Sequence, residues 1–272
     1  MIHTARKDWH IMNCKNIIDR LEEIAPVSFA EDWDNVGLLV GSRKKEAKKI
    51  MVALDATDSV IAQASEQQVD MLITHHPMIF SSMKRVNDED FIGRRIISLI
   101  QHDISYYAMH TNCDVCIMND VAADKIELKP TAILEEIGEA DGKSMGIGKV
   151  GTLPETISVQ QLAAKVKAAF QISDVRVTGD LQKKVSRVAI STGAGKSMMK
   201  LALKKGAEVF ITGDMDHHSV IDALDQGMQI IDAGHYGTEH FMVDYVASYL
   251  EKVFGSEIEV VKATEDNPFV VL

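Results

Sequence analysis

Two adjacent histidines, His75 and His76, close an apolar run in the sequence LITHHP and are followed by Pro77. Neighbouring side chains on a strand point to opposite faces, so both imidazoles can converge on one point only if the strand has already ended. Pro77 favours such an end, because it has no N–H and restricts the residue before it. An isolated pair of histidines is more often solvated than bound to a metal, so the rest of the chain must decide between these roles.

Further histidines and carboxylates follow other apolar runs. His110 and Asp114 are four residues apart, and His235 and Glu239 repeat this spacing. If a helix begins at each site, the members of a pair share one face of it, and Gly234 would let the chain turn sharply into the second helix. In open α/β sheets, ligands bind beyond the carboxyl ends of the strands. These side chains are therefore expected at one edge of the sheet.

Histidine and carboxylate ligands without thiolates suit zinc, manganese, iron, cobalt or nickel. About five such ligands favour two divalent ions bridged by one carboxylate over a single ion. Asp214, His217 and His218, in the sequence DMDHH, either extend this site or form its rim.

Apolar periodicity predicts the elements that would position these residues. The predicted strands are 49–55, 69–74 and 104–110, and the predicted helices are 16–26, 58–68, 91–103 and 158–170. Such alternation is typical of a largely parallel sheet covered by helices.

The order of these elements then recurs. Residues 50–76 align without a gap on residues 188–214, at a constant offset of 138 residues, and MLIT in the first segment matches VFIT in the second. Residues 108–114 (AMHTNCD) likewise match residues 233–239 (AGHYGTE), which pairs the two His-x-x-x-carboxylate motifs. The repeated spacing after corresponding strands indicates an internal duplication.

We therefore predict an α/β fold of two related lobes with mostly parallel sheets and a metal site between the lobes, at the carboxyl ends of their strands. The first α/β unit spans 12–127. The remainder, 128–272, contains a middle segment and the second unit. No Pro/Gly-rich linker separates them, so we expect the lobes to pack tightly.

Composition narrows the function classes. The chain of 272 residues is 46% hydrophobic and 25% charged, as in ordinary globular proteins, and its net charge is −11. An acidic surface argues against nonspecific binding to nucleic acid or to anionic membranes. The N-terminus contains no apolar core of the length that a signal peptide needs, so we expect a cytoplasmic protein.

Two motifs have a weaker claim to chemistry. Cys113 and Cys116 form a C-x-x-C, but the chain has three cysteines and no second C-x-x-C, so a redox or zinc pair is the minor alternative. STGAGKS at 191–197 imitates a phosphate loop, yet Ile190 stands where the first glycine is required. A tight strand-to-helix turn is the favoured role of this segment.

Five blocks together resemble a known family. They are DWDNVGLLVG (32–41), LITHHPMIF (72–80), HTNCD (110–114), VFITGDMDHHSVIDA (209–223) and IDAGHYGTE (231–239). The chain is similar over about residues 12–267 to the dinuclear-metal-centre proteins known as GTP cyclohydrolase I type 2 homologues, the Nif-three-like family.

The resemblance implies roles for individual residues. The family's metal ligands fall on His75, His76, Asp114, His235 and Glu239, with one carboxylate bridging two divalent ions. We assign the bridge to Glu239, because a carboxylate offers two oxygens and Glu reaches further than Asp.

His110 lies beside the ligands in the family's pattern, as a group that supports them or faces substrate, and we assign it a catalytic role. We also expect Asp34 and Asn35 to support the site through polar contacts, and Trp33 to pack. The resemblance further implies a homo-oligomeric toroid, usually a hexamer, and the short middle segment argues against the extra domain that some members carry.

Two function classes follow. The first is a metal-dependent hydrolase acting on a small molecule, such as a nucleotide or phosphoester, because two divalent ions can serve the cleavage of phosphoesters and of purine-ring amidines alike. The alternative is a noncatalytic metal-binding or regulatory oligomer. Metal analysis followed by a hydrolysis screen separates them, and replacing Cys113 and Cys116 tests the redox alternative.

Overall fold

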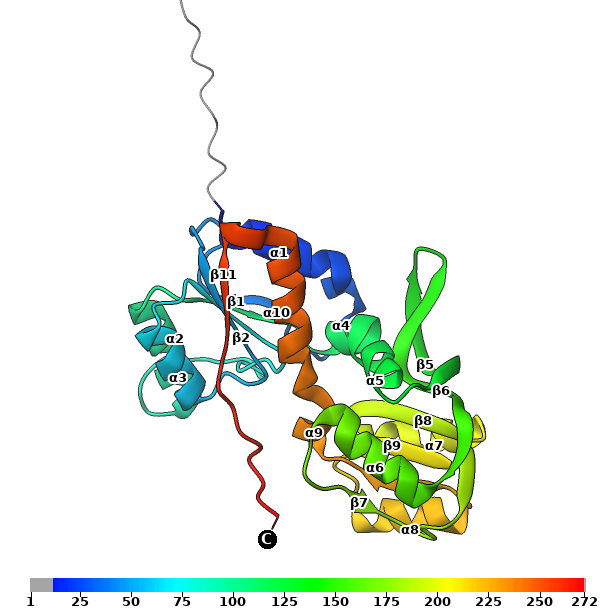
Figure 1. Ribbon diagram of the computed structural model, residues 1–272. Coiled ribbons are helices and arrows are strands. Elements are labelled where there is room, and N and C mark those ends of the chain that lie inside the picture. The colour runs from blue at the N-terminus through cyan, green and yellow to red at the C-terminus, as the bar shows by residue number, and fades with distance from the viewer. Residues whose placement is uncertain (1–11, 272) are drawn as a thin grey trace, which may run out of the picture.

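The computed structural model describes residues 12–271 and contains two α/β units, each built around its own sheet (Figure 1). The N-terminal residues on which the signal-peptide prediction partly rests lie outside the described range. Within that range, no helix is both long enough and apolar enough to cross a membrane.

The first unit is a sheet in the order β1-β4-β3-β2-β11, in which β4, β3, β2 and β11 are parallel and β1 is antiparallel. Its strands and helices are β1 (Gly37–Val40), β2 (Lys49–Ala53), β3 (Met71–Thr74), β4 (Ser105–Ala108), β11 (Glu259–Lys262), α1 (Cys14–Ile24), η1 (Val27–Phe29), α2 (Asp58–Glu66) and α3 (Phe91–Gln101). Side-chain caps start the helices where the sequence places them: Asn13, Thr57 and Asp90 accept backbone N–H groups of the first turns of α1, α2 and α3.

Three short helical segments leave the first sheet after β4 and lead to the second unit. They are α4 (Thr111–Cys113), a π-helical turn η2 (Asp114–Met118) and α5 (Asn119–Lys125). A π-helical turn is rare and is often found at a functional site, and this one begins at Asp114.

The second unit is a sheet in the order β5-β6-β8-β9-β10-β7. Strands β8, β9 and β10 are parallel and form its centre, and antiparallel strands flank them on both sides. Its elements are β5 (Lys129–Ala140), β6 (Lys143–Ser158), α6 (Val159–Phe170), β7 (Arg176–Val177), β8 (Lys184–Ala194), η3 (Gly195–Met198), α7 (Met199–Lys204), β9 (Val209–Gly213), α8 (His217–Asp225), β10 (Gln229–Asp232), α9 (His235–Glu239), α10 (Phe241–Phe254) and η4 (Gly255–Glu257).

The predicted middle segment supplies β5 and β6, a long antiparallel hairpin that extends from the second sheet (Figure 1). The end of the chain does not follow a simple division into two consecutive parts. Helix α10 leads back to the first unit, where β11 pairs in parallel with β2, so the last strand of the chain completes the first sheet.

The predicted duplication is visible in the strand register. Ile50 pairs with Met71 between β2 and β3, and Val188 pairs with Val209 between β8 and β9, so both partners are displaced by the same 138 residues. The order strand, helix, strand is the same in both segments. The segments 50–76 and 188–214 therefore correspond in register as well as in sequence.

The correspondence of the two His-x-x-x-carboxylate motifs is shifted by one residue relative to the strands. Thr74 pairs with Ala108, and its equivalent Thr212 pairs with Asp232, which sets His110 opposite Gly234 rather than opposite His235. His110 and Gly234 are both the residues that precede the following helix. The predicted pairing of His110 with His235 is thus wrong by one position.

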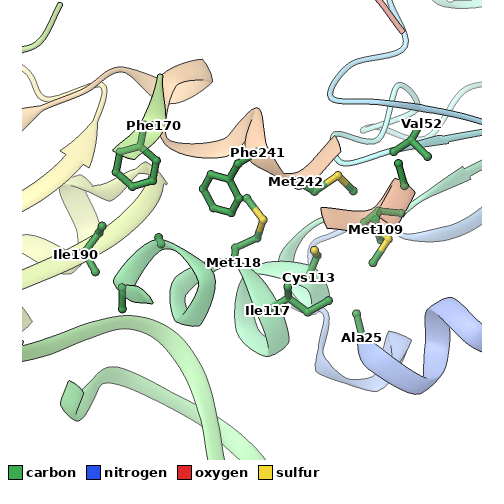
Figure 2. Packing of buried hydrophobic residues seen from close by; sticks show 14 of the residues in the cluster. Ala25, Val52, Met109, Cys113, Ile117, Met118, Phe170, Ile190, Phe241 and Met242 are labelled. Carbon is green, nitrogen blue, oxygen red and sulfur yellow. The ribbon is translucent and has the colours of Figure 1, made fainter. Parts of the chain in front are cut away.

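One apolar core joins the two units. Residues of the first sheet such as Ile50 and Val52 belong to the same buried cluster as Val188, Ile190 and Ile211 of the second. Figure 2 shows how Phe241 of α10, Phe170 of α6 and Met118 of η2 meet in the middle of this cluster. The rings of Phe170 and Phe241 stack with centroids 5.8 Å apart. Continuous burial of this kind holds the facing strand ends in a fixed relation.

Candidate metal centre

His75 and His76 lie directly beyond the end of β3, with His75 buried and His76 half-buried. Each ring is held through its Nδ1 atom: that of His75 lies 2.9 Å from the carbonyl oxygen of Met109, and that of His76 lies 2.9 Å from Oδ1 of Asp55. A ring whose Nδ1–H donates to an oxygen keeps a lone pair on Nε2. Both histidines are therefore oriented as metal ligands commonly are.

His235 and Glu239 come from α9, on the second unit. Gly234, with a φ of +75°, turns the chain from β10 into this helix. His235 Nε2 lies 3.3 Å from His76 Nε2, and Glu239 Oε2 lies 3.0 Å from the nitrogen of His76 and 3.1 Å from that of His235. Nδ1 of His235 is held 2.9 Å from Oδ2 of Asp214. Side chains from both sheets thus converge on one point.

Asp114, at the start of η2, completes the cluster. Its Oδ1 lies 3.6 Å from Nε2 of His75, and Oε2 of Glu239 lies 3.8 Å from the same nitrogen. Two of the three groups whose ligand atoms lie within 4.8 Å of one another contain a carboxylate: His76 with His235 and Glu239, and His75 with Asp114 and Glu239. Glu239 belongs to both groups.

Three buried atoms of this cluster make no hydrogen bond to the described residues: His75 Nε2, Asp114 Oδ1 and Glu239 Oε2. A buried polar atom without a partner costs about 1–3 kcal/mol, and a charged one costs more. All three atoms are electron-pair donors that face one another, so a cation among them would satisfy all three. The residues therefore fit a metal ion.

The charges of the cluster point the same way. Burial alone would lower the pKa of His76, but Asp55 and Glu239 outweigh it and raise the pKa to about 10. Contact with Glu239 likewise raises the pKa of His235 to about 9. Burial would raise the pKa of Glu239, yet the surrounding histidines hold that pKa well below its usual range. The negative charge of the carboxylates is thus stabilised by positive charge at this point, which either protons on the histidines or a metal ion can provide.

His110 precedes α4 and faces the same cluster. Its ligand atom lies within 4.8 Å of those of His75 and His76. Nδ1 of His110 is 3.0 Å from Oδ1 of Asp34, whose Oδ2 accepts hydrogen bonds from the backbone N–H and the hydroxyl of Thr111. Burial would raise the pKa of Asp34, but His110 and Thr111 outweigh it and lower the pKa to about 2. Asp34 therefore supports His110, through the kind of polar contact that the sequence predicted for it.

The irregular end of β8 also reaches the cluster, a role that the sequence did not predict. Gly193 has a φ of +64°, and a Cβ added to it would lie 2.2 Å from Oε1 of Glu239. Its N–H donates to the hydroxyl of Thr238 at 2.9 Å, next to Glu239 in α9. STGAGKS thus forms the end of β8 and the start of η3, a tight strand-to-helix connection as predicted, and Gly193 lets the carboxylate of Glu239 approach the backbone. The internal repeat contained a signal for this role, because it aligns Gly193 with Asp55, another residue of the site.

The DMDHH segment divides between two roles. Asp214 holds His235, whereas His217 and His218 are exposed at the start of α8 and belong to none of the three ligand groups among the described residues. Asp216 caps α8 by accepting the N–H groups of His218 and Ser219. This segment therefore supports the site through one residue and does not extend its ligand set.

Cys113 and Cys116 lie next to Asp114 but carry no sign of redox or zinc chemistry. Both are free thiols, and neither belongs to a ligand group in the described part of the chain. Burial raises the pKa of Cys113 well above its usual value and that of Cys116 to about 11. Because the thiolate is the reactive form, these thiols are expected to be inert.

Comparisons with known proteins identify the family of this chain. The family model Duf34/NIF3 (NGG1p interacting factor 3) matches residues 12–268. A Clostridium perfringens protein named GTP cyclohydrolase 1 type 2 homolog is 34% identical over 95% of this chain and 99% of its own length. A Clostridium acetobutylicum protein of the same name is 36% identical over 88% of this chain and 90% of its own. A solved structure of a Staphylococcus aureus hypothetical protein superposes with a TM-score of 0.85 at 30% identity, covering 96% of this chain and 99% of that one.

Proposed function

Because the chain belongs to the Duf34/NIF3 family, we propose that its histidine–carboxylate cluster holds two divalent metal ions and acts as a hydrolase on a nucleotide or a phosphoester. The observation that carries this proposal is the position of Glu239, which is shared by two groups of candidate ligands. A carboxylate can bind two ions through its two oxygens, whereas a neutral imidazole offers one lone pair to one ion. The names of the relatives, GTP cyclohydrolase 1 type 2 homolog, support a nucleotide as the substrate class.

The ligands would divide between the two ions. His76 and His235 would hold one, His75 and Asp114 the other, and Glu239 would contact both. This donor set of imidazoles and carboxylates suits zinc, manganese, iron, cobalt or nickel. When bound, two such ions supply Lewis acidity that polarises the scissile bond and activates water near neutral pH.

The residues of the chain supply orientation and proton transfer. Hydrogen bonds to Met109, Asp55 and Asp214 fix the ring planes and tautomers of the three ligand histidines. His110 is held through Nδ1 by Asp34, which leaves its Nε2 free to take a proton from water or to pass one to a leaving group. His110 is therefore proposed as the catalytic acid or base.

Assembly belongs to the same proposal. The family resemblance supports a homo-oligomer, and a hexamer in particular. Light scattering on the purified protein measures the mass of the assembly directly, and a monomeric mass at micromolar concentration would contradict it.

Metal analysis of the protein as purified, followed by a hydrolysis screen over nucleotides and phosphoesters, tests the proposed function. Two ions per chain and turnover that is lost with a chelator and restored with metal are expected. Two ions without turnover on any member of the panel would favour the alternative, a noncatalytic metal-binding or regulatory oligomer.

A further inference from the structure

Two aromatic side chains lie exposed beside the metal centre. Trp33 is 57% exposed and Phe80 is 56% exposed, and their ring centroids are 5.8 Å apart. Trp33 also lies edge-on to His110, with ring centroids 6.0 Å apart. Its predicted role in packing is thus not what the structure shows, because most of the indole is open to solvent.

The rings are held in place by the loops that carry the site. Trp33 directly precedes Asp34, which binds His110, and Asn35 donates a hydrogen bond to the carbonyl oxygen of Ile79 at 2.5 Å. Phe80 follows in the same segment that begins with His75 and His76. The two aromatic residues are therefore tied to the loops that carry His76 and Asp34, and Trp33 is in contact with His110.

A cavity of about 550 Å³ continues from Phe80. It is formed by the segment after the histidine pair and by the start of α3, and its lining residues are Met78–Arg85 and Asp90–Ile92. Volumes of 300–1,000 Å³ are typical of sites for small molecules and cofactors. Phe80 is common to the cavity wall and to the aromatic pair, so the two features form one continuous surface.

The cavity wall carries unpaired positive charge in an acidic protein. Lys84 and Arg85 are exposed, and neither forms an ion pair within residues 12–271. The acidic residue of the wall, Asp90, is engaged as the cap of α3, where it accepts the N–H of Gly93 at 2.9 Å. In a chain with a net charge of −11, two adjacent cations at a cavity that form no ion pair with the described residues supply local positive charge that can attract an anion.

We propose that Trp33 and Phe80 form a stacking platform for a flat heteroaromatic ring and that Lys84 and Arg85 hold an anionic group, such as a phosphate, attached to that ring. The proposal rests on the proposed function and names the recognition residues for its substrate. Aromatic side chains bind any flat ring by stacking, and Lys and Arg bind phosphate by charge. Neither pair is a metal ligand, so both can be altered without removing the ions.

Calorimetric titration of the metal-loaded protein with three probes tests the two halves of the site separately. The probes are guanosine 5′-monophosphate, guanosine and ribose 5-phosphate. The nucleotide should bind more tightly than either part. Trp33→Ala should weaken the nucleotide and guanosine about tenfold or more and leave ribose 5-phosphate unchanged, because only the ring loses its stacking partner. Trp33→Phe should restore most of the loss.

The double variant Lys84→Gln/Arg85→Gln should produce the opposite pattern: weaker nucleotide and ribose 5-phosphate, unchanged guanosine. Lys200→Gln/Lys204→Gln removes the same charge from two exposed positions of α7 and is the matched control. Phe269→Ala is the control for the loss of an exposed ring. Metal content is measured for every variant, so that binding is compared at equal loading.

The proposal is overturned if the native protein binds none of the probes, or if both sets of variants weaken all probes equally. It is also overturned if the control variants have the same effect. Because binding is measured without turnover, these outcomes are independent of the hydrolysis screen: a protein that hydrolyses nucleotides but ignores Trp33→Ala refutes the platform alone.

Discussion

His76 and Asp214 occupy equivalent positions in the two halves of the chain, 138 residues apart, but their side chains have different chemical roles. His76 follows β3 and points its Nε2 into the ligand cluster, whereas Asp214 follows β9 and holds Nδ1 of His235 at 2.9 Å. The duplicated backbone places a polar side chain at the end of each strand. In the proposed site, His76 is a ligand and Asp214 supports a ligand.

Asp214→Asn tests this supporting role. The amide can still contact the ring of His235, but it removes the charge that favours Nδ1–H, so the affinity for metal should fall about 10–100-fold while the protein stays folded. Titration with a metal-sensitive dye measures the change, and circular dichroism checks the fold. Asp222→Asn, an exposed carboxylate on α8, should leave the affinity unchanged. Equal affinity in both variants would show that Asp214 does not orient the ligand.

Gly193→Ala tests the close approach of the end of β8 to the cluster. A Cβ at this position would lie 2.2 Å from Oε1 of Glu239, and the positive φ adds strain of about 1–2 kcal/mol. We expect lower stability in urea unfolding and the loss of at least one metal per chain.

Gly142→Ala is the matched control for that variant. Its φ of +73° carries similar backbone strain, but nothing lies within 4 Å of the added Cβ. It should lower the free energy of unfolding by a comparable strain term and keep its metal. If Gly193→Ala behaves in the same way, the contact with Glu239 is not what requires a glycine.

Asp34 makes the stability of the protein depend on pH. Its pKa falls from 3.8 to about 2 on folding. A carboxylate with a lowered folded pKa stabilises the protein above its unfolded pKa, and this contribution is lost as the pH falls through the folded value. Asp34→Asn should therefore lower the free energy of unfolding by about 2 kcal/mol at neutral pH, and the difference from the native protein should shrink below about pH 4.

Urea unfolding at pH 7, 5 and 3.5 measures this difference. Asp225→Asn, on an exposed carboxylate at the end of α8, is the control and should change little at any of these values. A difference between Asp34→Asn and the native protein that grows on acidification would contradict the assignment of a lowered pKa.

His110→Ala separates catalysis from metal binding. Its Nδ1 is held by Asp34, and the proposed ligand set is complete without it. The variant should keep both ions and lose turnover, by about 10²–10⁴-fold if His110 is the general acid or base. Metal analysis and kcat on the same preparation test both halves. Loss of an ion together with activity would instead make His110 a ligand.

The sequence predicted the elements and the repeat because both depend on local pattern. Apolar periodicity located α2 and β3 within a few residues, and the gapless repeat gave the shared register of β2/β3 and β8/β9. The polar residues after these strands were predicted to converge, since parallel strands place their carboxyl ends at one edge. The structure brings His75, His76, Asp114, His235 and Glu239 together.

Other features depend on contacts between distant segments, which carry no local pattern. Strand β11 pairs with β2 after a long return through α10, so its sheet could not be read from its own residues. Asp55 follows β2 and His76 follows β3, 21 residues later. Asp55 supports His76 only because these two strands pair and their ends lie side by side. The one-residue shift of the second His-x-x-x-carboxylate motif arises at Gly234, where His235 moves inside the helix while His110 stays before it.

Glu239→Gln tests the residue on which the dinuclear arrangement depends. Oε2 of Glu239 lies 3.0 Å from Nε2 of His76, 3.1 Å from that of His235 and 3.8 Å from that of His75, so this carboxylate faces all three imidazoles. Glutamine keeps the size of the side chain but removes the negative charge that would offset the repulsion between two dications, and its amide nitrogen cannot act as a ligand. The variant should therefore lose at least one metal per chain and its hydrolytic activity, while its circular dichroism remains native.

The control is Glu251→Gln, which makes the same chemical change at an exposed position of α10 and should keep both ions. The fold is expected to survive the change at Glu239, because the apolar core that joins the two units does not include this side chain. Mass spectrometry under native conditions counts the ions in each assembly, and the hydrolysis screen is repeated at saturating metal. A Glu239→Gln protein with two ions per chain and unchanged activity would show that Glu239 is not the bridge. Asp214, the nearest carboxylate to His235 outside the ligand groups, would then be the next candidate.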